Sequence, residues 1–97
     1  HYEEAYQFDN CQAAKNYTTF HRSHQAPIVV SKHLSEYESL LPTAQFIRAH
    51  QSYLVNLEHV LRYEKGDKNH LVTTNDWTIP IALRRKDKVL QALKDLH

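Results

Sequence analysis

The sequence predicts one domain of mostly antiparallel β-structure with two short helices, the second of them an amphipathic helix at the C-terminus. Short runs of β-branched and aromatic residues recur along the chain, turn-forming residues separate them, and helical spacing is confined to two segments. The chain has 97 residues, of which 41% are hydrophobic and 24% are charged. A chain of this length buries roughly 60–70% of its unfolded surface, which is enough for one core.

The predicted strands follow one another at short intervals. They cover residues 6–12, 17–21, 28–30, 46–48, 59–64, 71–74 and 78–82. The segment Lys65-Gly66-Asp67-Lys68 predicts a hairpin between the fifth and sixth strands, and Asn75-Asp76 predicts the next turn. The C-terminal half is therefore expected to form an antiparallel meander.

Two segments have apolar residues at three- and four-residue steps, which is the spacing of a helix. The first follows Ser31, a preferred N-cap residue, and Pro42 stops it. The second begins at about Arg85 and is amphipathic. Its apolar face consists of Val89, Leu90, Leu93 and Leu96.

The composition excludes several classes of function. The chain has one glycine, Gly66, so it lacks the glycine-rich loops that hold nucleotide phosphates. No Ser or Cys stands in a nucleophile turn and the carboxylates are scattered, so no enzyme and no cofactor are expected. The only close histidine pair, His21 and His24, is three residues apart on a predicted strand, which points the rings to opposite faces and argues against a metal site.

The targeting signals and the charge distribution of the sequence favour a cytoplasmic protein with a modest preference for polyanions. No apolar run is long enough to span a bilayer, and the N-terminus has no secretion signal. The single cysteine, Cys11, cannot form an intrachain disulfide and is expected to be a small core residue. The net charge is +1, but the first ten residues carry only acidic charges, so residues 11–97 hold 12 Lys and Arg against 8 Asp and Glu.

Three stretches carry a family resemblance. Residues 11–18 read Cys-Gln-Ala-Ala-Lys-Asn-Tyr-Thr, residues 46–57 read Phe-Ile-Arg-Ala-His-Gln-Ser-Tyr-Leu-Val-Asn-Leu, and residues 79–85 read Ile-Pro-Ile-Ala-Leu-Arg-Arg. In this order they resemble the LytTR family of bacterial DNA-binding domains, whose signature is Phe-x-Arg-x-His-x-Ser-Tyr-hydrophobic-Val-Asn. The chain departs from the family at Ala82 and Leu83, where relatives usually have Ser and Arg.

The resemblance assigns residues 11–97 to the DNA-binding domain, and residues 1–10 to a partial N-terminal strand or the remnant of a linker. It implies the output domain of a response regulator in a two-component phosphorelay, which controls transcription by sequence-specific binding of double-stranded DNA. The loops would enter successive major grooves at paired promoter repeats, with a receiver domain elsewhere in the full-length protein and a possible dimer on DNA. The altered Ala82-Leu83 pair leaves an alternative open, in which the domain is a protein-interaction module without DNA binding.

The first candidate contact loop contains Lys15, Asn16 and Tyr17. Tyr17 stands at the family's base-contacting position, and Lys15 and Asn16 are expected to contact or support the DNA backbone. The alternative is a plain hairpin turn in which Asn16 adopts the left-handed conformation and Tyr17 packs against the domain.

The second candidate loop contains His50 and Gln51. Gln51 falls at the family's base-contacting position and can pair with adenine, while Arg48 is predicted to bind phosphate and His50 to support the loop. The alternative is that His50 and Ser52 hydrogen-bond the backbone of the turn. Residues 53–55 are expected to fill the core, and Asn56 to cap a helical turn at residues 57–59.

The third candidate site is the start of the C-terminal helix, where four cations crowd together. They are Arg84, Arg85, Lys86 and Lys88. The helix dipole disfavours cations there by about 0.3–1 kcal/mol each, so an anion is expected to compensate. We expect Arg84 to contact a base and the other three cations to contact phosphates. With Lys15 and Arg48 this makes about five phosphate contacts, which predict a slope of log affinity against log salt concentration near −4 to −5. The alternative is a solvated basic face balanced by Asp87.

Overall fold

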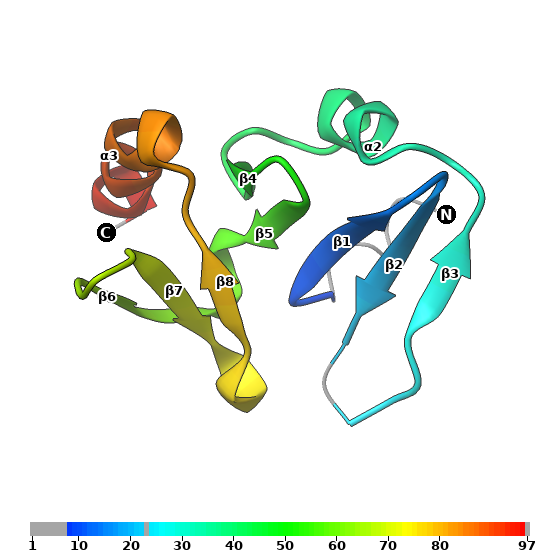
Figure 1. Ribbon diagram of the computed structural model, residues 1–97, viewed down its shortest axis with the longest axis horizontal. Helices are drawn as coiled ribbons and strands as arrows, with labels where there is room; N and C mark the ends of the chain where they lie inside the picture. Colours follow the sequence, from blue (N-terminus) through cyan, green and yellow to red (C-terminus); the bar gives the residue numbers. More distant parts are fainter. Residues whose placement is uncertain (1–7, 23, 97) are drawn as a thin grey trace.

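A computed structural model describes residues 8–22 and 24–96, which form two antiparallel sheets side by side (Figure 1). The first sheet has the strand order β3-β2-β1-β5-β4, and the second has the order β6-β7-β8. The first sheet consists of β1 (Asn10–Ala14), β2 (Tyr17–His21), β3 (Ile28–Val30), β4 (Phe46–His50) and β5 (Tyr53–Asn56). The second consists of β6 (Val60–Glu64), β7 (His70–Thr73) and β8 (Thr78–Pro80). The predicted meander at the C-terminal half is confirmed.

Two α-helices pack on these sheets, α2 on the first and α3 beside the second (Figure 1). The helical segments are α2 (Leu34–Leu40), α3 (Lys86–Leu96) and the short 3-10 helices η1 (Leu57–His59), η2 (Thr74–Asp76) and η3 (Leu83–Arg85). The N-cap of α2 is His33 rather than the predicted Ser31. The reason is local, because the Glu36 carboxylate accepts the backbone N–H of His33 at 3.0 Å and fixes the start of the helix there.

The interior strand β5 was not predicted as a strand. Its residues Leu54, Val55 and Asn56 are all buried, since β5 lies between β1 and β4 and contributes to both sides of the sheet. A strand covered on both faces shows no alternation of apolar and polar residues, so the sequence pattern indicated only core. The predicted cap is confirmed, because the Asn56 side chain accepts the N–H of Glu58 at 3.1 Å at the start of η1.

The apolar side chains form two clusters, and the β4–β5 hairpin contributes to both. The first cluster consists of Phe8, Cys11, Phe20, Leu34, Leu41, Phe46 and Leu54. The second consists of Ala49, Val55, Leu71, Ile79, Ile81 and Val89. Neighbouring residues on β5, Leu54 and Val55, therefore point into different clusters. This arrangement makes the hairpin the shared wall between the two halves of the domain.

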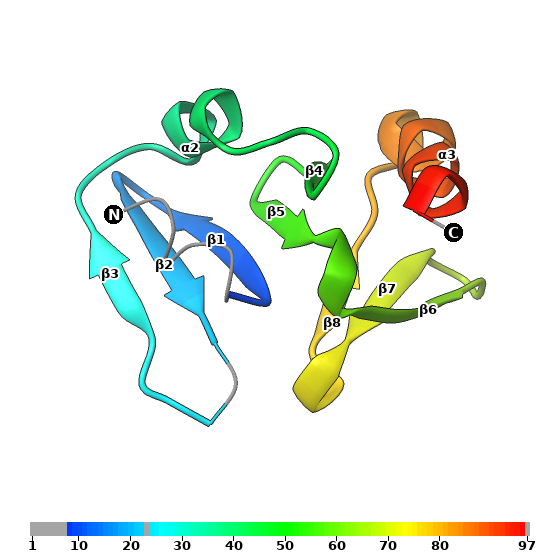
Figure 2. The same ribbon diagram turned by 180° about the vertical axis from the view of Figure 1, so that it is seen from behind.

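The chain crosses from the first sheet to the second through η1 (Figure 2). A buried carboxylate also joins the two halves: Asp9 Oδ1 lies 2.8 Å from His59 Nδ1 and accepts the hydroxyl of Thr74 at 2.8 Å. Phe8, Asp9 and Asn10 are all buried, so the packed domain includes them. The rest of the predicted N-terminal segment, residues 1–7, lies outside the described residues, and with it part of the strand predicted at 6–12.

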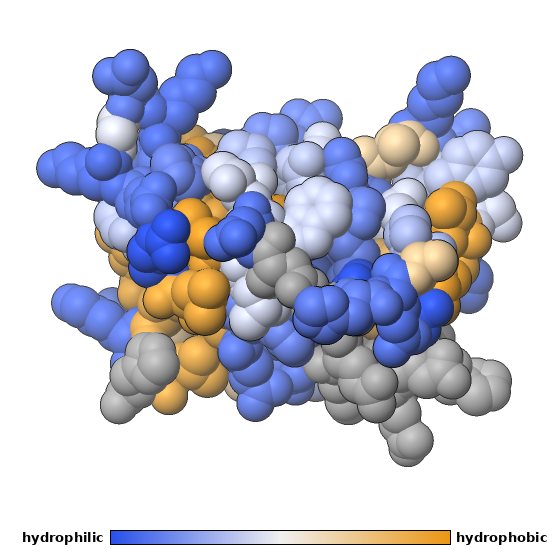
Figure 3. Space-filling view, turned by 90° about the horizontal axis from the view of Figure 1, so that it is seen from below, coloured by the Kyte–Doolittle hydropathy of each residue, from blue (hydrophilic) through white to orange (hydrophobic). Residues whose placement is uncertain are grey.

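The outer surface is divided between apolar and hydrophilic areas. Seen from below, apolar residues gather on the side of the second sheet and α3, and hydrophilic residues cover much of the remainder (Figure 3). In the described ranges 8–22 and 24–96, no helix is both long and apolar enough to cross a membrane.

Candidate nucleic-acid interface

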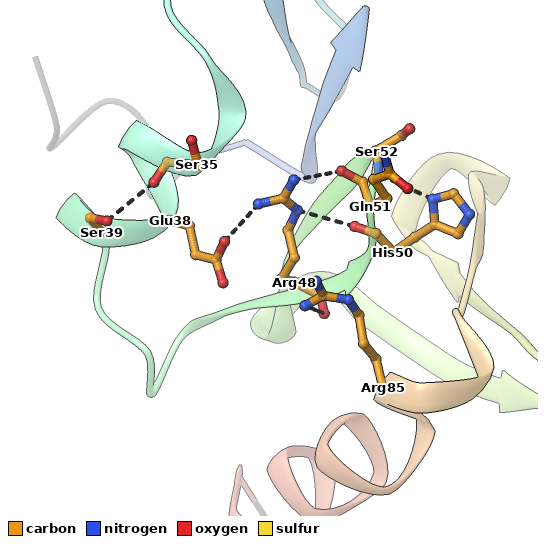
Figure 4. A network of polar contacts seen from close by, with 8 residues as sticks. All are labelled: Ser35, Glu38, Ser39, Arg48, His50, Gln51, Ser52 and Arg85. Atoms are coloured by element: carbon orange, nitrogen blue, oxygen red, sulfur yellow. Dashed lines mark hydrogen bonds and ion pairs between the residues drawn. The ribbon is translucent and has the colours of Figure 1, made fainter.

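The turn between β4 and β5 is held by one arginine side chain (Figure 4). Arg48 Nε donates to the carbonyl of His50 at 3.1 Å, and Nη2 donates to the carbonyl of Gln51 at 2.5 Å. Its Nη1 donates to the Glu38 carboxylate of α2 at 2.6 Å. The guanidinium group therefore joins the helix to both carbonyls of the turn, and its side chain is only 14% exposed.

The same turn has a second internal support. His50 Nδ1 accepts the backbone N–H of Ser52 at 3.0 Å, and the ladder between β4 and β5 shifts register at this point. These contacts use Nδ1 and the carbonyl of His50 within the turn, as the alternative anticipated for His50. The side chain of Gln51 remains exposed at the tip. The turn is thus a rigid support for one free amide side chain.

The turn between β1 and β2 is a two-residue hairpin turn. Lys15 has a positive φ of 55°, whereas Asn16 does not, so the left-handed residue is the one before the predicted Asn16. A positive φ at the first central residue alone is the pattern of a type II′ turn, which matches the twist of paired strands. Lys15, Asn16 and Tyr17 are all exposed, Tyr17 by 52%, so the expected packing of Tyr17 in a plain hairpin does not occur.

The third segment is η3 and the first turn of α3. Arg84 and Lys88 are exposed, whereas Arg85 and Lys86 are half-buried. Arg85 Nη1 lies 3.4 Å from the carbonyl of Arg48, and its Nε is buried without a hydrogen-bond partner. Asp87, the acid expected to balance the cations, lies exposed in the first turn of α3.

Backbone hydrogen bonds bring the three segments together around the β4–β5 turn. The N–H of Ala13, at the end of β1, donates to the carbonyl of Ser52 at 2.8 Å. On the other side, the N–H of Ala82, directly before η3, donates to the carbonyl of Ala49 at 2.9 Å. The three segments lie in the upper half of the molecule in Figure 1. The three predicted base-contacting residues, Tyr17, Gln51 and Arg84, are all exposed on them.

Sequence reasoning missed two supporting residues of these segments. Glu38 pairs with Arg48 from ten residues away on a different element, and no local pattern marks that pairing. Gln12 on β1 links the two neighbouring strands: its Nε2 donates to the hydroxyl of Tyr53 on β5 at 3.0 Å, and its Oε1 lies 2.9 Å from Nε2 of His21 on β2. Its position opposite Tyr53 follows from the pairing of β1 with β5, a strand that was not predicted.

Nothing in the described ranges points to metal or nucleophile chemistry. Among residues 8–22 and 24–96, no group of three or more His, Cys, Asp or Glu side chains could hold a metal ion. Cys11 is buried in the first cluster, and this burial raises the pKa of its thiol to about 12. A thiol in that state is a core residue rather than a nucleophile, as the sequence predicted.

Two antiparallel sheets, whose connecting segments carry exposed cationic, amide and phenolic side chains, define the chain as a β-rich domain with a polar contact surface. The family model of the LytTr DNA-binding domain matches residues 5–94, and the chain therefore belongs to the LytTR family of DNA-binding domains. This family serves transcription regulation and is not enzymatic. The resemblance stated from the three sequence stretches is thus confirmed.

One solved structure supports the fold. The LytTr DNA-binding domain of a putative methyl-accepting/DNA response regulator from Bacillus cereus is similar with a TM-score of 0.80 and 22% sequence identity. The match covers 92% of this chain and 83% of that chain. The predicted fold class, mostly antiparallel sheets with short helices and a C-terminal helix, is therefore confirmed. No curated protein sequence matches the chain.

Proposed function

We propose that this domain binds double-stranded DNA in a sequence-specific manner, as the output domain of a two-component response regulator that controls transcription in the cytoplasm. The observation that supports this most strongly is the convergence of the three exposed segments on the β4–β5 turn. Base edges in DNA offer hydrogen-bond donors and acceptors, and side chains on fixed loops can match them. Membership of the LytTR family gives the ligand class.

The base contacts in this proposal come from Gln51, Arg84 and Tyr17. The exposed Gln51 amide suits adenine, and the Arg84 guanidinium suits guanine, because each can form two parallel hydrogen bonds with that base. Tyr17 can use its hydroxyl toward a base or the backbone. Because the turn beneath Gln51 is held by Arg48 and His50, the amide is presented with little loss of conformational entropy on binding.

The phosphate contacts come from fewer cations than the sequence suggested. Lys15 and Lys88 are exposed and Lys86 is half-buried, so all three ammonium groups can reach solvent, with Asn16 as a further donor. Arg48 and Arg85 lie against the turn and each other, and we assign them to positioning rather than to phosphate binding. Three phosphate contacts per domain predict a salt slope of about −3, instead of −4 to −5.

The proposal includes contacts in two successive major grooves, and the length of the whole domain is comparable with the distance between them. Its longest extent is 32 Å, and successive major grooves on one side of B-DNA are about 34–36 Å apart. The outer segments, Lys15 to Tyr17 and Arg84 to Lys88, would then enter the two grooves, with the β4–β5 turn between them. Paired promoter repeats, a dimer on DNA and a receiver domain in the full-length protein complete the proposal, as the resemblance of the sequence to the LytTR family implies.

Selection of bound duplexes from a random pool tests the function and yields the site in one experiment. We expect enrichment of a short motif, followed by binding that weakens with added salt at a slope of about −3 per domain. No enrichment, together with equal and weak affinity for all duplexes, would favour the protein-interaction module instead. The observation that favours that second candidate is Leu83, a leucine 83% exposed at the start of the third segment.

A further inference from the structure

Leu83 is the most exposed large apolar residue in the described part of the chain, at 83%. It belongs to neither apolar cluster, although Ile81 and Val89 on either side of it are buried. Its neighbour Arg84 is one of the proposed base-contacting residues. A single exposed apolar side chain is common on protein surfaces, so the setting of Leu83 decides whether it serves as a contact.

The backbone around Leu83 is fixed on both sides. Before it, the N–H of Ala82 donates to the carbonyl of Ala49 on β4 at 2.9 Å. After it, the N–H of Arg85 donates back to the carbonyl of Ala82 at 2.8 Å and closes the 3-10 turn. The leucine therefore projects from a closed turn that is attached to the sheet, so its exposure is a feature of the folded state.

The surroundings of Leu83 restrict what it can contact. Four cations lie within five residues of it on the same segment, namely Arg84, Arg85, Lys86 and Lys88. A ligand that fits this segment must present negative charge around a small apolar group. The major groove of DNA does so, because phosphates line it and each thymine places a C5-methyl group on its floor.

We propose that Leu83 is a specificity-determining residue that contacts the methyl group of a thymine, at or next to the base pair that Arg84 contacts. This inference rests on the proposed function and adds to it one base preference that hydrogen bonding does not supply. Thymine and cytosine differ at this position because cytosine carries hydrogen where thymine carries the methyl group. Leu83 thus makes the third segment select a T·A pair beside the Arg84 contact.

The test changes the DNA as well as the protein. In the selected duplex, each thymine is replaced in turn by deoxyuridine, which removes only the methyl group, and dissociation constants are measured for the wild type and Leu83→Ala. We expect one thymine whose replacement weakens wild-type binding about fourfold, the factor for one buried methyl group. The same replacement should leave the affinity of Leu83→Ala unchanged, because the two changes remove one contact.

Leu61→Ala is the matched control, since Leu61 is also an exposed leucine, at 58%, but lies on β6 of the second sheet. It should bind and respond to deoxyuridine like the wild type. Two results overturn the inference. One is that deoxyuridine lowers the affinity of Leu83→Ala as much as that of the wild type. The other is that no replaced thymine lowers the affinity of the wild type. Loss of all sequence preference in the wild type would instead refute the proposed function, so the two failures are distinct.

Discussion

Replacing Arg48 with lysine tests whether this residue positions the β4–β5 turn or binds DNA itself. A lysine can keep the ion pair with Glu38, but a single ammonium group cannot also hold the carbonyls of His50 and Gln51. Hydrogen bonds from a charged donor contribute about 1.5–3 kcal/mol each, and water replaces part of this at an exposed turn. We expect a net loss of about 1.4 kcal/mol in binding, which is about tenfold in the dissociation constant.

The assay is DNA binding measured by fluorescence anisotropy at several salt concentrations. A positioning residue lowers affinity without changing the slope of log affinity against log salt, because the number of neutralised phosphates is the same. The control is Glu38→Gln, which removes the ion pair but leaves both carbonyl contacts, so affinity should fall much less than in Arg48→Lys. Wild-type affinity in Arg48→Lys, together with a slope reduced by about 0.9 in Arg48→Ala, would refute the reasoning and restore the phosphate contact.

Three further predictions concern other parts of the domain. Arg84→Ala should weaken binding to the selected site by about 1–3 kcal/mol and relax the preference at one base pair. Lys88→Ala should weaken binding to all sequences alike. If Arg84→Ala also lowered the affinity for selected and random DNA equally, Arg84 would not contact a base. Cys11 should resist iodoacetamide in the native domain and react only after unfolding, since burial raises the pKa of its thiol to about 12, and rapid labelling of the folded protein would argue against its burial. Burial lowers the pKa of His21 below its usual 6.5, against the opposing charge of Asp9, so below pH 6.5 the unfolded chain binds a proton that the folded domain does not. Stability should therefore fall as the pH drops through this range, and thermal unfolding of His21→Gln should show a smaller fall; an identical pH dependence in the variant would exclude His21 as its source.

The sequence predicted the parts of the fold whose signals are local. The turn at Lys65 to Lys68, the cap at Asn56 and the apolar face of α3 all depend on residues within a few positions of one another. The strand β5 was missed because three of its four residues are buried, with Leu54 in the first apolar cluster and Val55 in the second. Which strand is buried on both faces depends on the order of the strands in the sheet, and a short stretch of sequence does not reveal that order.

In the candidate site, too, the local features were predicted from the sequence and the contacts between distant elements were not. The motif positions of Tyr17, Gln51 and Arg84 pointed to side chains that are exposed in the structure. The prediction treated Arg48 as a cation free to meet phosphate, because a motif does not reveal that Glu38 and two carbonyls already occupy its donors. Partners from distant elements decide whether a charged group is available, and only the folded arrangement supplies them.

The hairpin of β4 and β5 also bears on how the domain unfolds. Because Leu54 packs in one apolar cluster and Val55 in the other, neither half can lose its packing without exposing the strand on which the other half depends. The domain should consequently melt as one cooperative unit, with a single transition for both sheets. A deletion that removes α3 would take Val89 out of the second cluster, to which β4 and β5 contribute Ala49 and Val55, so the intact fold and the capacity to bind DNA should be lost together.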